Sequence, residues 1–360
     1  MMNTLFNATH LGAFKLENKI IMAPMSRNRA THDGLATDLM ATYYAQRASA
    51  GMIISEGIQP SVQGQGFMNS PGLHSQQQKE SWRKVTHSVH NEGGLIVAQL
   101  MHSGRIGHPS LYESAHQSVA PSAIAAKGQT FTPNGLQDYL TPKALSQQEI
   151  KKCIQDFVLA ARNAIDAGFD GVEIHAGNGF LLHQFMASNT NTRTDEYGGS
   201  IENRNRFVVE VSQAVANAIG ADKTGIRISP GNPYNDIEEL DSEVLYSNLI
   251  ARLPKLAFLH LMEANNREQT LKIRHQWQGP FILNPHKTQK EGAVTPEIAA
   301  QVLKDELADA VCFGALFVSN PDLVQRIKIN APFNELDPST FYGGDHRGYT
   351  DYPTLLKHSA

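Results

Sequence analysis

The stretch Gly171-Val172-Glu173-Ile174-His175-Ala176-Gly177-Asn178-Gly179-Phe180 runs from an apolar strand pattern directly into a glycine-rich turn. Val172 and Ile174 supply the strand pattern, and the turn carries His175 and Asn178. Two neutral hydrogen-bond donors at the end of a strand suit the binding of an oxygen on which negative charge develops, such as a carbonyl, phenolate or nitro oxygen. In the alternative interpretation, His175 is a hydrogen-bonded core histidine and Asn178 is a turn residue.

Seven further apolar runs of the same kind are spread along the chain. The eight runs together cover residues 20–24, 52–57, 95–100, 171–175, 225–229, 258–262, 280–284 and 310–314. They are almost continuously apolar, which is typical of parallel strands covered on both faces. Helix-start signals lie between them: a capping box at 146–149, a proline at the first helical position at Pro296 and at Pro321, and acidic residues at 241–243.

Eight strands, each followed by a helix, predict an α/β fold of the (β/α)8 TIM-barrel class that forms one domain over residues 1–360. A doubly wound open sheet is the main alternative, but no Gly-x-Gly-x-x-Gly pattern follows a first strand. The longest interruption, at about 104–145, is rich in Ser, Pro, Gly and His and follows the third strand. That is the face where barrels keep their active sites, so we expect a lid or a wall of the substrate pocket.

The composition is that of an ordinary globular protein and argues against several classes of partner. The 360 residues are 41% hydrophobic and 18% charged, with a formal net charge of −4 and no basic run, which disfavours nucleic-acid binding. Residues 1–19 lack a signal-peptide pattern, and no apolar run approaches the ~20 residues that span a bilayer, so we expect a cytoplasmic protein without a membrane partner. Cys153 and Cys312 lie in apolar contexts and are expected to be core residues.

In a barrel, polar residues just beyond the carboxyl ends of the strands face the active site. These positions hold Ser26, Arg27, Glu56, Gln99, His102, His175, Asn178, Arg227, Ser229, His260, Glu263, Asn284, His286 and Lys287. The spacings of a metal site and the Gly-x-Ser-x-Gly elbow of a serine hydrolase are absent, so no metal is expected. Gln99 and Arg227 hold a polar ring better than they move protons. We therefore expect a bound cofactor to carry the chemistry.

Several motifs occur along the chain in a specific order. They are Ile21-Met22-Ala23-Pro24-Met25-Ser26-Arg27, Gln99, His175 with Asn178, Asn191-Thr192-Arg193-Thr194-Asp195-Glu196-Tyr197-Gly198-Gly199-Ser200-Ile201-Glu202-Asn203-Arg204, Gly225-Ile226-Arg227, and Phe341-Tyr342-Gly343-Gly344 with Gly348-Tyr349-Thr350-Asp351-Tyr352-Pro353. Together they resemble the Old Yellow Enzyme family over about residues 5–353. The resemblance implies a (β/α)8 barrel that binds FMN, reduces activated alkenes, and takes its electrons from NADPH or NADH.

The resemblance also implies a role for each matching residue. Cofactor-binding positions are then Pro24, Met25, Ser26, Gly57, Gln99, Arg227, Asn284, Gly314 and Ala315. Arg227 is expected to place a cation near the pyrimidine end of the flavin, because the reduced flavin is anionic there. His175 and Asn178 are expected to bind the electron-withdrawing oxygen of a small-molecule alkene. Phe67, Met101 and Tyr349 are expected to line the substrate pocket.

The chain departs from the family pattern at both ends of this site. Phe180 stands where the family commonly has the tyrosine that delivers a proton to the substrate, so that proton must come from water or another residue. At the phosphate end, Ala315 replaces an arginine, and Pro285 lacks a backbone N–H. Lys287 and Lys290 are the cations available nearby to replace them.

Two functional hypotheses remain open at this point. The first is a flavin-dependent reductase, monomeric or homodimeric, with weak phosphate binding and a changed proton donor. The second is a ligand-binding protein or a flavin-free acid–base enzyme on the same scaffold. The retained Gln99 and Arg227 favour the first, since loss of the flavin would remove the reason for both.

Overall fold

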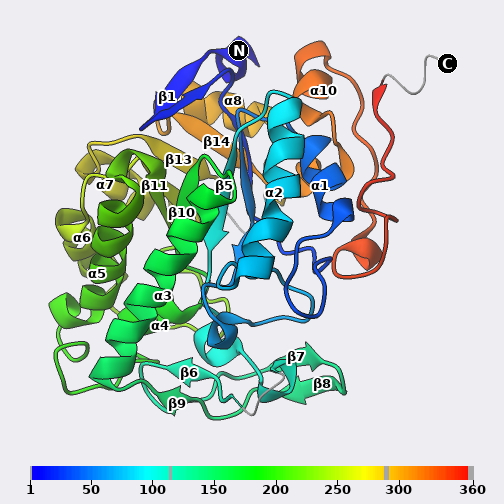
Figure 1. Ribbon diagram of the computed structural model, residues 1–360. Helices are drawn as coiled ribbons and strands as arrows, with labels where there is room; N and C mark the ends of the chain where they lie inside the picture. Colours follow the sequence, from blue (N-terminus) through cyan, green and yellow to red (C-terminus); the bar gives the residue numbers. More distant parts are fainter. Residues whose placement is uncertain (1, 113–115, 288–291, 356–360) are drawn as a thin grey trace.

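A closed barrel of eight parallel strands lies at the centre of the molecule (Figure 1). The computed structural model describes residues 2–112, 116–287 and 292–355. In chain order the barrel strands are β3 (Ile20–Met22), β4 (Met52–Ile58), β5 (Ile96–Leu100), β10 (Gly171–Ala176), β11 (Thr224–Ile228), β12 (Phe258–Met262), β13 (Phe281–Asn284) and β14 (Ala310–Phe313). Pairing of β14 with β3 closes the barrel. Each predicted apolar run overlaps one of these strands, to within one residue at the ends of β4, β10 and β11, and the (β/α)8 prediction is confirmed.

Helices surround the barrel and connect its strands (Figure 1). They are α1 (Asp38–Ala45), α2 (Gln76–Asn91), α3 (Gln147–Asp166), α4 (Leu181–Met186), α5 (Ile201–Ile219), α6 (Ser242–Arg252), α7 (Arg267–Gln276), α8 (Pro296–Lys304), α9 (Ala315–Ser319) and α10 (Leu323–Ile329). No helix within the described ranges is long and apolar enough to cross a membrane. Cys153 and Cys312 are buried free thiols, as expected of core residues.

Three of the four predicted helix starts are confirmed. Ser146 caps α3 in a reciprocal capping box with Glu149, α8 has Pro296 in its first turn, and α6 begins directly after Asp241. The prediction at Pro321 is wrong by two residues, because the backbone before that proline still ends α9 and α10 begins only at Leu323.

The amino end of the barrel is closed by an N-terminal hairpin that the sequence did not predict. Its strands β1 (Thr9–Leu11) and β2 (Phe14–Leu16) pair antiparallel, and the backbone N–H of Ala13 donates to the carbonyl of Asp222 just before β11. The ring of Phe14 lies 6.2 Å from that of Phe258 on β12. A Cβ added to Gly171 would come within 2.5 Å of the Phe14 ring, so a glycine is required there. The amino end of the barrel is therefore filled with side chains.

The segment between β5 and α3 follows the third barrel strand, as expected. It contains two small sheets, the pair β6 (Val119–Ala120) and β9 (Lys143–Ala144) and the hairpin of β7 (Gln129–Thr132) and β8 (Gly135–Asp138). Figure 1 shows these four strands together below the barrel, at the opposite end of the molecule from the N-terminal hairpin. That the segment between β5 and α3 acts as a lid stays a prediction.

We expect Phe14→Ala to destabilise the protein by about 3–5 kcal/mol, because it opens a cavity in a fully packed barrel floor. Chemical denaturation measures the effect, and Phe131→Ala is the matched control, since the Phe131 side chain is 66% exposed. Equal stability of the two variants would show that the hairpin does not stabilise the amino end of the barrel.

Candidate active site

A cavity of about 1050 Å³ opens at the carboxyl ends of the barrel strands. Its lining includes Pro24, Met25, Ser26, Gly57, Phe67, Gln99, Met101, His175, Asn178, Phe180, Arg227, Asn284, Gly314 and Ala315. These are all but one of the residues that the sequence assigns to cofactor binding, catalysis or the substrate pocket. Residues from the segment between β5 and α3, such as Phe131 and Tyr139, complete the wall. The structure thus brings the predicted set together in one place.

A hydrogen-bonded set of polar side chains lies inside the barrel at the level of the cavity floor. Gln99 on β5 donates from Nε2 to the Glu173 carboxylate on β10 over 2.8 Å. The other Glu173 oxygen lies 2.7 Å from Nδ1 of His260 on β12. Because a carboxylate only accepts, it fixes the Gln99 amide with its nitrogen towards Glu173 and its carbonyl directed elsewhere.

The role of Glu173 was missed at the level of sequence. The available signal is a charged residue in the middle of an otherwise apolar run, which is rare unless the charge is paired. His260 was recognised only as a polar residue at a strand end. Its Nε2 atom is buried and has no hydrogen-bond partner in the protein.

Arg227 on β11 brings a cation into the same floor. It lies between His175 and His260 in the strand register, and its side chain donates to the Asn284 amide oxygen over 3.3 Å. Burial lowers the pKa of Arg227, and the nearby Glu173 carboxylate offsets part of that effect. The Nε atom of Arg227 is buried without a partner in the protein. A buried guanidinium with an unused N–H is suited to an electron-rich or anionic group in the cavity.

His175 is held as a neutral imidazole. It is buried, and burial lowers its pKa well below the usual value, with Arg227, His260 and His183 adding to the effect. Its Nδ1 atom has no partner in the protein. A neutral imidazole keeps one N–H to donate, so His175 can bind a ligand oxygen without carrying a charge of its own.

The backbone of Asn178 is in the left-handed region, with φ of 53°, and its neighbours hold it there. The Ser229 hydroxyl accepts from the Asn178 backbone N–H over 2.7 Å, and Asn235 donates to the Asn178 carbonyl over 2.7 Å. Asn232 donates to the Asn178 side-chain oxygen over 3.2 Å. With the oxygen engaged, the NH₂ group is the part of this amide that can donate to a ligand.

A second buried group fixes the turn that carries Asn178. The backbone N–H of Gly179 donates to Nδ1 of His183 over 3.0 Å, so Nε2 of that ring carries the proton and donates to Glu239 over 2.8 Å. Tyr246 donates to the same Glu239 oxygen. Burial and Glu239 raise the pKa of Tyr246, which keeps the phenol protonated. Sequence reasoning missed this group, because its members come from two separate connections, the one between β10 and β11 and the one between β11 and β12.

The wall next to His175 is apolar. The ring of Phe180 lies 5.4 Å from the His175 ring and 6.3 Å from the Phe67 ring, with which it makes an edge-to-face pair. Met101 packs over Gly57 so closely that a Cβ on Gly57 would come within 2.8 Å of the Met101 sulfur. Phe180 thus fills the position of the family tyrosine with a ring of similar size and no hydroxyl.

The prediction that Tyr349 lines the substrate pocket is wrong. Tyr349 is fully buried, its ring stacks on Tyr43 at 4.0 Å, and the Arg29 guanidinium lies over it at 4.3 Å. It is absent from the lining of the cavity. Its physical role is to anchor the C-terminal segment against α1. The prediction failed because a motif in the sequence does not determine which way a side chain points.

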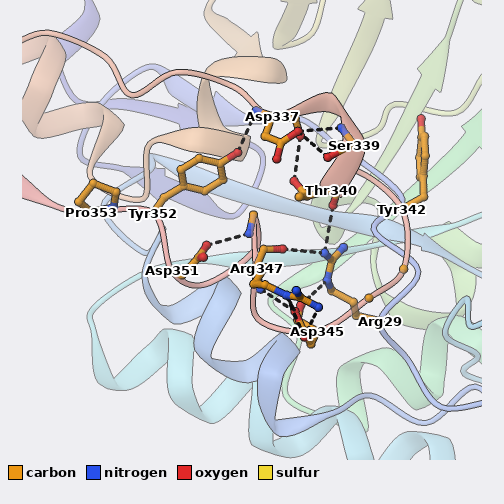
Figure 2. Close-up of a pocket in the computed structure, with 13 residues that line it drawn as sticks. Arg29, Asp337, Ser339, Thr340, Tyr342, Asp345, Arg347, Asp351, Tyr352 and Pro353 are labelled. Atoms are coloured by element: carbon orange, nitrogen blue, oxygen red, sulfur yellow. Dashed lines mark hydrogen bonds and ion pairs between the residues drawn. The ribbon is translucent and has the colours of Figure 1, made fainter.

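That C-terminal segment forms a second, shallower hollow of about 710 Å³ (Figure 2). Figure 2 shows Arg29 directed into the segment, where its guanidinium donates to the carbonyl oxygens of Thr340, Asp345 and Arg347. Arg347 itself pairs with Asp345 at the surface. The Arg29 donors are engaged by backbone, so this hollow is a structural junction.

Within the described part of the chain, few positive charges lie at the end of the cavity near Ala315. Among the described lining residues, only Arg27 and Arg227 have a guanidinium or ammonium group. Arg27 donates to backbone carbonyl oxygens of the C-terminal segment and to Tyr43. Lys290 lies outside the described residues, and Lys287 is not part of the lining.

Residues 4–334 match the family of proteins described as NADH:flavin oxidoreductase / NADH oxidase. The chain belongs to this family. It is similar to the probable flavin mononucleotide-dependent alkene reductase of Leishmania infantum, with 39% identity over 96% of each chain. Among solved structures, it is similar to morphinone reductase in complex with tetrahydroNAD, with 40% identity, 98% of this chain and 97% of that chain covered, and a TM-score of 0.91. The old yellow enzyme homologue from Zymomonas mobilis shows 39% identity, 98% and 100% coverage, and a TM-score of 0.92.

The Old Yellow Enzyme resemblance is therefore confirmed, and the chain is a member of a family of FMN-dependent, NAD(P)H-dependent oxidoreductases. The residues present fit the ring of FMN. The unpartnered Nε of Arg227 and the fixed Gln99 amide offer donor and acceptor groups to the polar edge of such a ring. The described residues at the end near Ala315 offer less to a phosphate.

Three buried histidines predict a pH dependence of stability. Burial lowers the pKa of His102 to about 3 and also lowers the pKa values of His175 and His260. Below about pH 6.5 the unfolded chain binds protons that the folded chain excludes, so stability falls with falling pH by up to ~1.4 kcal/mol per unit for each histidine. Denaturation at pH 7 and pH 5 measures this slope. His102→Asn, which keeps an acceptor for the Gly104 N–H, should reduce the slope, and an unchanged slope would contradict the assignment.

Proposed function

We propose that this protein is an ene-reductase, which reduces alkenes activated by a carbonyl or nitro group. The observation that carries the proposal is the pair of neutral donors, His175 and Asn178, in one cavity with the buried cation of Arg227. Such donors stabilise an oxygen that gains negative charge when hydride adds to the conjugated carbon. The aromatic wall at Phe180 and Phe67 favours an apolar substrate body.

Bound FMN supplies the hydride in this family. In this chain Gln99 and Arg227 are proposed to hold the polar edge of the ring, and the remaining predicted contacts are Pro24, Met25, Ser26, Gly57, Asn284, Gly314 and Ala315. Glu173 keeps the Gln99 carbonyl turned away from itself and available as an acceptor. The fixed cation of Arg227 favours a flavin with negative charge at its edge.

The reductant, the cellular location and the oligomeric state of the protein stay predictions. Morphinone reductase binds tetrahydroNAD, which favours a nicotinamide in the same cavity here. NADH and NADPH differ by one phosphate, and both remain candidates. A cytoplasmic location and a monomeric or homodimeric state are likewise predictions made from the sequence. The segment between β5 and α3 is proposed to act as a lid, because Phe131 and Tyr139 lie in the cavity wall.

The second candidate function is a ligand-binding protein that holds FMN poorly or not at all. The observation that favours it is the weak phosphate end, where Ala315 offers no cation. The two functions differ in FMN affinity, which an experiment can measure directly.

We expect the purified protein to bind FMN less tightly than an otherwise identical variant with the missing cation restored. Ala315→Arg should tighten FMN binding about 10- to 150-fold, because a charge-assisted hydrogen bond contributes ~1.5–3 kcal/mol. Quenching of FMN fluorescence measures the affinity, and Ala315→Met controls for added bulk without charge. No detectable FMN binding to the unaltered protein at high micromolar concentration would favour the ligand-binding function.

Removal of both donors tests substrate binding separately. The double variant His175→Ala/Asn178→Ala should lose affinity for simple phenols and slow enone reduction by at least about 10²-fold, since one such donor contributes ~2.7–4 kcal/mol at a developing oxyanion. FMN binding should persist, because its proposed ring contacts lie elsewhere. Asn217→Ala is the control, because Asn217 lies on an exposed face of α5. Unchanged enone reduction in the double variant would remove the basis of the proposal.

A further inference from the structure

Reduction of an alkene needs a proton as well as a hydride, and Phe180 cannot supply it. Hydride adds to the carbon remote from the activating group, and the electron pair of the double bond then lies on the neighbouring carbon and the activating oxygen. That carbon must take a proton to complete the product. Phe180 has no hydroxyl, and His175 has a pKa well below its usual value, so neither is a suitable acid at neutral pH.

Three phenols line the cavity: Tyr139, Tyr234 and Tyr342. Tyr234 and Tyr342 are 57% and 72% exposed. Tyr139 is only half-buried by its neighbours, but it is the least exposed of the three. A well-placed acid must stay in one position next to the substrate, and the two exposed rings are poorly suited to that requirement.

Tyr139 also packs on the part of the wall where the family tyrosine is missing. It lies against the small apolar cluster of Met101, Ile106, Ala126 and Phe180, together with Phe67. This cluster is in contact with the His175 ring through Phe180, at 5.4 Å between ring centres. Tyr139 therefore belongs to the same part of the cavity wall as Phe180, next to His175.

The surroundings of Tyr139 hold its ring and keep its proton. Its backbone N–H donates to the Gly128 carbonyl over 3.3 Å, next to the hairpin of β7 and β8. The side chain of Thr130, which is buried and also lines the cavity, hydrogen-bonds to the phenol. Burial raises the pKa of Tyr139 and outweighs the hydrogen bond from Thr130, which lowers it, so the phenol is protonated throughout the neutral range.

We propose that the Tyr139 hydroxyl donates the proton to the substrate carbon next to the activating group. The inference rests on the proposed ene-reductase function and names the acid that this function requires. The O–H bond of Tyr139 breaks, a C–H bond forms, and the resulting tyrosinate takes a proton from water at the cavity mouth. The hydride carries both electrons and comes from the nicotinamide by way of the flavin, and Tyr139 supplies the proton, so atoms and charge balance. Compared with the family pattern, the proton donor then lies in the segment between β5 and α3 instead of the turn after β10.

The test compares Tyr139→Phe with the unaltered protein, both loaded with FMN and reduced under nitrogen. Reoxidation by cyclohexenone should slow by about 10²-fold or more in Tyr139→Phe. Reoxidation by a quinone, which needs no proton on carbon, should stay within about 2-fold. Tyr352→Phe, which removes a phenol outside the cavity, is the matched control.

A second readout separates a proton donor from a residue that only shapes the wall. In D₂O the unaltered protein should place deuterium on one face of the substrate carbon, whereas delivery from water in Tyr139→Phe should lower that selectivity. Adding Phe180→Tyr to Tyr139→Phe should restore the rate, because it returns a phenol to the same cluster.

Equal cyclohexenone rates in Tyr139→Phe and the unaltered protein would overturn the proposal while leaving the reductase function in place. Loss of rate in Tyr234→Phe instead would assign the acid to that residue and also overturn it. Equal slowing with the quinone and the enone would show a structural role and count against proton donation. If the unaltered FMN-loaded protein is not reoxidised by any activated alkene, the ene-reductase function fails, and the proposal fails with it.

Discussion

The buried carboxylate of Glu173 is the constraint on which the active-site end of the barrel depends. A charge inside a barrel costs several kcal/mol unless it is hydrogen-bonded and balanced. Glu173 meets that requirement through Gln99 on one side and His260 on the other, with the Arg227 cation close enough to interact electrostatically with Glu173 and His260. These side chains come from β5, β10, β11 and β12. The register of four neighbouring strands and the charge of the cavity floor are therefore set by the same interactions.

The floor and the wall of the cavity are built differently. The floor consists of side chains fixed by strand register, and its hydrogen bonds leave defined atoms unused: Nε of Arg227 and Nδ1 of His175. The turn after β10 is fixed nearly as well, because its Gly179 N–H donates to His183, which in turn is hydrogen-bonded to Glu239. The wall between β5 and α3 comes instead from small two-stranded sheets with exposed apolar side chains such as Phe131. A change in substrate or proton donor is accommodated more easily in this wall than in the floor, since few other contacts depend on it.

Much of this fold could be predicted from the sequence, for identifiable physical reasons. Parallel strands covered on both faces must be continuously apolar, so all eight were visible, and the Ser146 capping box marked α3 to the residue. The hairpin that carries Phe14 was not visible, because its strands are three residues each and show no clear periodicity. The cavity lining followed from positions at strand ends and from a family resemblance. Tyr349 was misplaced because a motif fixes a position along the chain and not the direction of its side chain.

The pairings between the polar groups that support the site could not be predicted, since the partners are distant in the sequence. Glu173 and His260 are 87 residues apart, and His183 and Glu239 are 56 residues apart. The most direct test of the account is a crystal structure of the FMN-loaded protein with a simple phenol bound. We predict the polar edge of the flavin ring within hydrogen-bond distance of Gln99 and Arg227, and the phenol oxygen between His175 and Asn178. A flavin bound outside the barrel mouth, or a phenol oxygen directed away from both donors, would contradict it.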